Sequence, residues 1–202
     1  MNVKIEKAFP IPASAETSWA LLQDILGVAG CMPGASITER LDDKRYKGLV
    51  GVKFGPASMS FRGEVEVKSI DAASHTLRLV GKGTDGTGSS GASMDLTARI
   101  EAVDAASCTL VGNSEVSVSG KAAAFGARMM NTVADQVLKQ FAANFAARAQ
   151  ALQPPPGNDG EVAGAAKQDS EPAAQPPQLN ALALAWAVIK DWLRALFSPK
   201  KA

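Results

Sequence analysis

Residues that could do chemistry are few and scattered in this 202-residue chain. His75 is the one histidine and stands beside Ser74 in a predicted turn, where a general base would be exposed. Asp95 and Glu101 share one face of a predicted strand, but about 20 Å of strand separates them, too far for paired acid–base work. The sequence therefore predicts neither a catalytic constellation nor a metal site built from His, Cys and carboxylate residues.

Two glycine motifs match nucleotide-binding loops without their structural context. Residues 81–86 read G-x-G-x-x-G, but the predicted strand 94–100 follows where a dinucleotide site needs the start of a helix. Gly120-Lys121 lacks the upstream glycine of a P-loop and precedes Ala122. The glycine tract itself leaves two interpretations, a flexible hairpin or a mobile rim at the mouth of a cavity. Its members are Gly81, Gly83, Gly86, Gly88 and Gly91.

Composition narrows the class of protein further. The formal net charge of +1 argues against general nucleic-acid binding, which needs a strong basic excess. Cys31 and Cys108 lie far apart and form no C-x-x-C unit, so we predict buried thiols instead of a disulfide framework or a zinc site. The N-terminal residues MNVKIEKAFP lack the apolar region of a secretory signal, which favours a cytoplasmic protein.

The pattern along the chain predicts an α+β protein. Apolar and polar residues alternate over 3–9 and in several segments of 36–119, and short turns join these segments as in an antiparallel sheet. A slip in the alternation near Gly63 predicts a β-bulge there. After the first strand, Ser14 can cap a helix that runs to about Leu26, where glycines are expected to end it.

Residues 121–152 predict one long helix, because large apolar residues recur there at helical spacing. The curved sheet must bury one face against this helix. Their contact can be an ordinary packed core, or it can leave an apolar pocket with adaptable methionine walls. For the second case we predict that the pocket is lined by Phe54, Met59, Phe61, Leu79, Met94, Phe125, Met129, Met130, Val133 and Val137.

Composition changes after the long helix. Residues 153–178 hold six of the eleven prolines and show no apolar period, which predicts a disordered linker. The chain is therefore expected to consist of a domain at 1–152, the linker at 153–178, and a helical segment at 179–197 with a basic end at 198–202.

The segment 179–197 predicts an amphipathic helix that associates with membranes. Its residues would span about 28 Å as a helix, near the lower limit for crossing a bilayer. Lys190, Asp191 and Arg194 interrupt the apolar run. An interfacial helix is therefore favoured over a membrane span, and docking on a protein partner is the third possibility. The membrane-binding residues that we predict are Leu182, Trp186, Ile189, Trp192, Leu193, Leu196, Lys200 and Lys201.

Over residues 1–150 the chain resembles the CoxG family, which takes its name from a subunit of carbon monoxide dehydrogenase and lies within the START-like (SRPBCC) helix-grip superfamily. The resemblance rests on Cys31-Met32-Pro33-Gly34, on the segment 51–56 (GVKFGP) running into 60–65 (SFRGEV), on the glycine tract 81–93, and on 116–126 (VSVSGKAAAFG) before the long helix. Each piece is short, and their combination is what is typical of the family.

The resemblance implies a helix-grip fold, in which a seven-stranded antiparallel sheet wraps around the C-terminal helix and encloses an apolar cavity. It implies a non-catalytic protein that holds a quinone (menaquinone or ubiquinone) or a lipid and has no covalently bound cofactor. The implied partners are membrane lipid and a CO dehydrogenase-type molybdenum hydroxylase, which the protein would recruit to the cytoplasmic face of the inner membrane and link to the quinone pool.

Two other functions remain open at the level of sequence. An aromatase/cyclase-like enzyme of the same superfamily would need polar groups that converge inside the cavity, and Arg62, Asp95, Arg99 and Tyr46 are the candidates. An assembly factor with a filled core would need no cavity at all.

Overall fold

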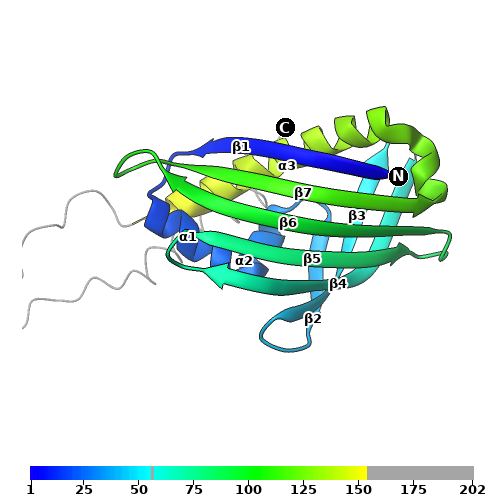
Figure 1. The fold of residues 1–202 in the computed structure, drawn as a ribbon, viewed down its shortest axis with the longest axis horizontal. Helices are drawn as coiled ribbons and strands as arrows, with labels where there is room; N and C mark the ends of the chain where they lie inside the picture. Colours follow the sequence, from blue (N-terminus) through cyan, green and yellow to red (C-terminus); the bar gives the residue numbers. More distant parts are fainter. Residues whose placement is uncertain (56, 154–202) are drawn as a thin grey trace, which may run out of the picture. The chain divides into compact units, whose positions relative to one another are not determined.

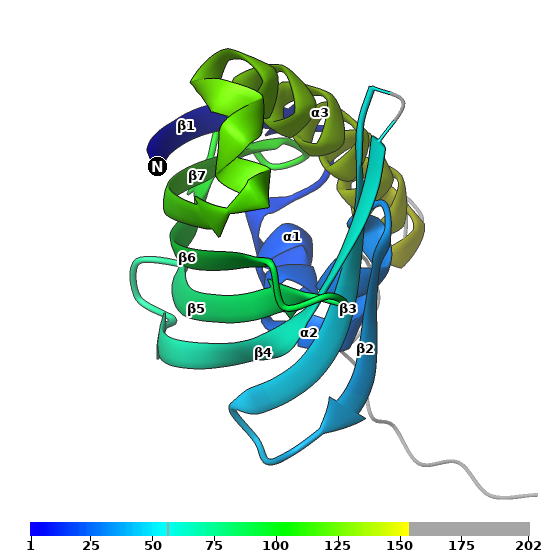
Figure 2. The same ribbon diagram turned by 90° about the vertical axis from the view of Figure 1, so that its right-hand side faces the viewer.

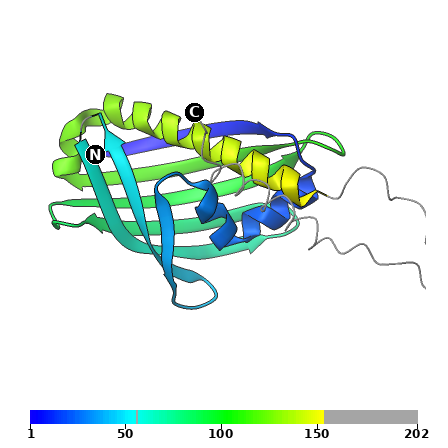
Figure 3. The same ribbon diagram turned by 180° about the vertical axis from the view of Figure 1, so that it is seen from behind.

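The computed structural model describes residues 1–55 and 57–153, which fall within one compact unit, and it confirms the α+β architecture. A seven-stranded antiparallel sheet curves around the interior, and two short helices close one end of it (Figure 1). A long helix crosses the open side of the curve (Figure 3). The predicted helical segment 179–197, and all of the predicted linker beyond Gln153, lie outside the described residues.

The strands lie in the order β1-β7-β6-β5-β4-β3-β2. Strands that follow one another from β2 to β7 pair as hairpins, and β1 pairs with β7 at one edge. The strand bounds are β1 (Asn2–Ile11), β2 (Ala35–Arg40), β3 (Arg45–Phe54), β4 (Ala57–Asp71), β5 (Thr76–Asp85), β6 (Ser90–Ala102) and β7 (Cys108–Gly120). Because β5 and β6 extend through most of the glycine tract, only residues 86–89 form the turn between them.

The β-bulge predicted near Gly63 is wrong in position. Gly63 stays in register with Gly48 on one side and Gly83 on the other, and the register shifts between Val67 and Ser69. A Cβ atom on Gly63 would lie 1.9 Å from a backbone oxygen of β5, so the two strands approach too closely there for any side chain. Beyond this point the β3–β4 hairpin rises toward the long helix (Figure 2). Gly63 therefore marks a close approach of strands, not an inserted residue.

Two helices, α1 (Ala15–Gln23) and α2 (Ile25–Cys31), replace the single predicted helix. The predicted cap is confirmed, because Ser14 Oγ accepts a hydrogen bond of 3.2 Å from a backbone N–H in the first turn. Asp24 caps α2 in the same way, through a 3.0 Å bond from the Gly27 N–H. Gly27 and Gly30 lie inside α2. A Cβ atom on Gly27 would lie 2.2 Å from the capping carboxylate of Asp24, and one on Gly30 would lie 3.4 Å from the Arg148 guanidinium. These glycines let α2 pack closely on the long helix and do not end it.

The long helix, α3 (Gly126–Leu152), follows a 3-10 turn, η1 (Lys121–Phe125). The helical segment predicted at 121–152 is thus confirmed with a change of geometry at Gly126, whose φ is +76°. The helix contacts β1 and β3, on either side of the curved sheet, and also α1 and α2. Within the described residues, no helix has the length and apolar character needed to span a membrane.

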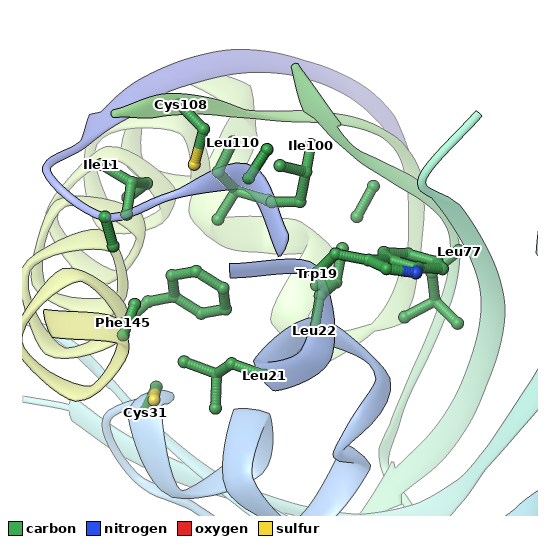
Figure 4. Packing of buried hydrophobic residues seen from close by; sticks show 14 of the residues in the cluster. Ile11, Trp19, Leu21, Leu22, Cys31, Leu77, Ile100, Cys108, Leu110 and Phe145 are labelled. Atoms are coloured by element: carbon green, nitrogen blue, oxygen red, sulfur yellow. The ribbon is translucent and has the colours of Figure 1, made fainter. Parts of the chain in front are cut away.

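The packed core lies at the end of the sheet that α1 and α2 close. Figure 4 shows Phe145 of α3 pointing toward Leu21 of α1, with Ile11 and Cys108 from the neighbouring strands around it. Phe145 is fully buried, and both cysteine thiols are buried and free, as predicted. The other labelled members are Trp19, Leu22, Cys31, Leu77, Ile100 and Leu110.

Candidate functional site

The inner face of the sheet follows from the strand register. Tyr46, Val65, Gly81 and Met94 form one continuous row across β3, β4, β5 and β6, and the buried members of this row belong to or pack on the core. Because side chains alternate along a strand, every second residue from these positions also points inward. The interior therefore has two halves, the packed core beside α1 and α2 and a second half toward the β3–β4 hairpin.

This second half, which we call the open half, is lined by apolar side chains that are only partly buried. Val50 of β3 faces inward and is 41% exposed. The half-buried inner-face residues of β3 to β6 are Val52, Met59, Phe61, Val65, Met94 and Leu96. A packed core would cover such side chains, so we infer from their partial exposure an apolar trough between the sheet and α3.

The first half of α3 supplies the opposite wall of the open half. Met130 and Phe141 are half-buried and share a side of the helix with the buried Phe145. Val133 and Val137 are half-buried on the adjoining flank. Met129, at the start of the helix, is 38% exposed and lies about 160° around the helix from Phe145, so it is not part of this wall. Phe125 is half-buried in η1, one residue before the helix.

That the predicted pocket residues line one shared pocket stays a prediction, but the structure gives the position of most of them. Met59, Phe61 and Met94 lie on the sheet side of the trough, and Met130 lies on the helix side. Leu79 differs, because it is 9% exposed and belongs to the packed core. Phe54 is the last residue of β3, and its side chain is outside what the structure describes. The predicted tail residues, from Leu182 to Lys201, are also outside the described residues.

Two glycines of the inner face leave space that sequence reasoning missed. A Cβ atom on Gly81 would lie 3.7 Å from Met94 Cε and 3.7 Å from Val65 Cγ2, which is ordinary contact. A Cβ atom on Gly112 would lie 3.9 Å from Leu96 Cδ1. Both positions could take a Cβ atom without a clash. The glycine tract was the available signal for Gly81, but which of its members face inward depends on the register, and Gly112 lies outside the tract.

Few polar groups face the interior among the described residues. The Ser114 hydroxyl, on the inner face of β7, is buried without a hydrogen-bond partner in this part of the chain. At the β1 edge, Lys7 Nζ lies 2.8 Å from Asp135 Oδ1 of α3, and both side chains are partly exposed. The interior is therefore apolar with polar groups near one side, a composition suited to an apolar ligand with a small polar part.

Three of the four residues proposed for a cyclase-like reaction point away from the interior. Asp95 pairs with Arg78 on the outer face at 2.7 Å, and its pKa is lowered mainly by the hydrogen bond from that arginine. Arg99 pairs with Glu101, and Arg62 is exposed on the outer face. Tyr46 faces inward, but its hydroxyl donates to the Asp43 carbonyl at 3.4 Å. The required convergence of polar groups is therefore missing from this set.

The other chemically active residues serve packing. Burial raises the pKa of both thiols, an effect offset in part by Arg148 for Cys31 and by a hydrogen bond with Ser18 for Cys108. His75, which was expected to be exposed, is half-buried and stacks on Trp19 with ring centroids 5.4 Å apart. No group of His, Cys, Asp and Glu residues in the described part of the chain could hold a metal ion.

A broad, open hollow of about 770 Å³ crosses β1, β7, β6, β5 and β4, and no residue of α3 lines it. Its polar side chains, among them Arg62, Glu64, Lys82 and Ser93, alternate with the inner-face residues and so point outward. The hollow is therefore separate from the trough between the sheet and α3.

Two of the segments that suggested a family from sequence, 31–34 and 51–56, meet in space. Gly51 donates a 2.8 Å backbone hydrogen bond to Gly34, and a Cβ atom on Gly34 would lie 2.3 Å from the Gly51 oxygen. A family model described as CoxG, a carbon monoxide dehydrogenase subunit, matches residues 8–150. The chain belongs to the CoxG family. This CoxG match covers the sheet from within β1 to the end of α3, and it confirms the resemblance drawn from sequence.

Solved structures share the fold of this CoxG-family chain at low sequence identity. A conserved protein from Geobacillus kaustophilus aligns with a TM-score of 0.66 and 19% identity, covering 75% of this chain and 96% of its own. The Zhui aromatase/cyclase from Streptomyces sp. R1128 aligns with a TM-score of 0.54 and 17% identity, over 74% and 94% of the two chains. A START superfamily protein from Mycobacterium smegmatis aligns with a TM-score of 0.53 and 18% identity, over 74% and 99%.

These likenesses show the START-like helix-grip fold and leave the activity open. No curated protein sequence matches the chain.

Proposed function

We propose that this CoxG-family protein is a non-catalytic carrier that holds an apolar ligand, a quinone (menaquinone or ubiquinone) or a lipid, in the open half of its interior. The observation that carries the proposal is the partial exposure of inward-facing apolar side chains from Val50 to Met94, beside a core that is fully packed. Each exposed CH₂ group of such a ligand costs about 0.8 kcal/mol in water, and transfer into the trough removes that cost.

The family description supports the second part of the proposal, a partnership with an oxidoreductase. We infer that the protein brings a CO dehydrogenase-type molybdenum hydroxylase to the cytoplasmic face of the inner membrane and connects it with the quinone pool. The helical segment 179–197 would hold the protein at the membrane, and the linker at 153–178 would let the ligand-binding domain move above it.

Extraction of the purified full chain with organic solvent, followed by mass spectrometry, tests the carrier function. We expect a quinone or lipid that co-purifies with the wild-type protein. The Gly81→Leu variant is compared with the wild type. Its side chain would occupy the trough between Met94 and Val65 and should reduce the amount of ligand that is recovered. The proposal would be contradicted if no apolar molecule were extracted from the wild-type protein and if added menaquinone did not quench its tryptophan fluorescence.

A further inference from the structure

One end of the domain combines apolar exposure with the open half of the interior. This mouth end consists of the β3–β4 hairpin, the turn at 86–89 and the start of α3 (Figure 2). Met1, Val50 and Met129 are 37%, 41% and 38% exposed there. Large apolar side chains at the rim of a trough favour contact with an apolar phase.

The mouth end also carries cations without acidic partners. Lys53, Arg62, Lys121 and Arg128 are exposed, and none of them belongs to an ion pair formed between described residues. Two acids lie nearby. Glu64 stands in register opposite Lys82, and the Asp85 carboxylate accepts a 2.7 Å hydrogen bond from the Ser90 N–H in its own turn.

The opposite end of the domain has the reverse charge. Asp71 and Asp104 occupy its hairpin turns, and Glu16 lies in the first turn of α1. None of these three acids belongs to an ion pair between described residues. Unpaired charges of opposite sign at the two ends give the domain an electric dipole, and an anionic surface would orient the mouth end toward itself.

We propose that the mouth end of the domain docks on an anionic lipid bilayer. The four cations can reach phosphate groups while their aliphatic stems and the side chains of Val50 and Met129 enter the apolar boundary of the bilayer. The docked orientation places the open half of the interior against the lipid. The docking proposal rests on the proposed function in one respect. It assumes that the ligand passes between the bilayer and this trough.

A fluorescent probe on the full chain tests the docked orientation without interference from the tail. An environment-sensitive dye is attached at Ser58→Cys, an exposed position in the β3–β4 hairpin, and in a second protein at Ala73→Cys, an exposed position at the opposite end. The native thiols are buried, and burial raises the pKa of each, so the label goes to the introduced cysteine. Vesicles of phosphatidylcholine with phosphatidylglycerol should shift the spectrum at residue 58 and leave residue 73 unchanged.

Charge reversal supplies a matched pair of variants. Lys53→Glu with Arg128→Glu removes cations from the mouth end, whereas Lys44→Glu with Lys139→Glu makes the same change of net charge elsewhere in the domain. The mouth-end pair should weaken the vesicle dependence of the residue-58 signal by about tenfold or more, and the control pair should leave it near the wild-type value. Thermal unfolding of all the variants shows whether each one is folded.

Several results would overturn the docking proposal. These are equal spectral shifts at residues 58 and 73, no shift at residue 58 on vesicles that the protein binds, and equal effects of the two charge-reversal pairs. Binding of the mouth end to an acidic protein, without binding to vesicles, would also overturn the docking proposal. Ligand extraction from the same preparations separates this proposal from the proposed function. A residue-58 shift without extractable ligand contradicts the carrier, and ligand without the shift contradicts docking.

Discussion

At the scale of single residues, Asp71 and Asp104 stabilise two turns through the same kind of hydrogen bond. The turns at 71–74 and 104–107 are both Asp-Ala-Ala-Ser, and in each the aspartate Oδ1 accepts a backbone N–H two residues on, at 3.0 Å from Ala73 and 2.8 Å from Ala106. The pKa of Asp71 is lowered, first by the bond from the Ser74 hydroxyl and then by the bonds from the Ala73 and Ser74 backbone N–H groups. The bonds favour the ionised carboxylate, so folding favours the deprotonated form of Asp71.

The sign of the pH dependence follows from that preference. A carboxyl group whose folded-state pKa lies below its unfolded value stabilises the fold above the unfolded value, near 3.8, and loses this effect as the pH falls through the folded value. The melting temperature should therefore fall below about pH 4, and Asp71→Ala should lower it at neutral pH. The difference between wild type and variant, measured by circular dichroism, should shrink in acid. A difference that stays constant down to the lowest pH would contradict this account.

Gly81 is the residue at which the size of the trough can be changed directly. Gly81→Ala adds a Cβ atom at ordinary contact distance from Met94 and Val65, so ligand affinity and stability should stay near the wild-type values. Gly81→Leu should lower the affinity for menaquinone by about tenfold or more, because the added side chain competes for the same apolar space. Fluorescence titration measures the affinity, and thermal unfolding checks the fold. Equal affinities for both variants would place the ligand elsewhere.

At the scale of elements, the bend of the sheet depends on where strands can approach one another. The inner-face row through Gly48, Gly63 and Gly83 places three glycines side by side on β3, β4 and β5. A Cβ atom on Gly83 would lie 3.0 Å from the Arg62 oxygen, and one on Gly48 would lie 2.8 Å from the Ser36 oxygen. This row lets the β3–β4 hairpin rise toward α3, and the hairpin forms one wall of the trough.

Gly63→Ala tests the role of this row. Its methyl group would collide with backbone atoms of β5, and relief of the clash should cost about 3 kcal/mol of unfolding free energy, measured by urea denaturation. The matched control is Gly86→Ala in the turn between β5 and β6, where a Cβ atom has no neighbour within 4 Å. Comparable stability of the two variants would show that β4 and β5 can separate without cost.

At the scale of the whole molecule, packing is uneven across one continuous sheet. Phe145 is fully buried at the closed end, whereas Met130, earlier on the same side of the helix, is only half-buried. The same helix therefore completes a core with one half and covers a trough with the other. A carrier needs both properties, because the packed half stabilises the fold while the open half exchanges its contents.

The predicted tail helix defines the last test. Burial of five large apolar side chains, from Leu182 to Leu196, would contribute on the order of 10 kcal/mol before ordering costs. Trp186→Glu with Leu193→Glu should release the full chain from anionic vesicles in flotation assays, whereas Gln175→Glu with Gln178→Glu adds equal charge in the linker and should not. High salt should weaken wild-type binding without abolishing it. Undiminished flotation of the first variant pair, also when Lys53→Glu and Arg128→Glu remove cations from the mouth end, would contradict a tail anchor.

Local pattern predicted most of the secondary structure from sequence alone, and short motifs carried the resemblance to the family. Period-two alternation located the strands, helical spacing located the long helix, and Ser14 marked the start of α1, because these signals arise within a few residues of chain. The same rules misplaced the β-bulge and ended a helix at glycines that α2 contains. Neighbours distant in sequence matter in both cases, because β5 approaches Gly63 and Arg148 approaches Gly30, although the capping Asp24 is the nearest neighbour of Gly27.

The candidate site needed the tertiary structure for the same reason. Sequence spacing identified apolar residues such as Met94 and Met130 but could not separate a filled core from a trough. That distinction depends on strand register, which sets Gly81 on the inner face, and on the curvature that holds the β3–β4 hairpin beside α3. Register and curvature are properties of paired strands, so they exist only once segments far apart in the sequence have come together.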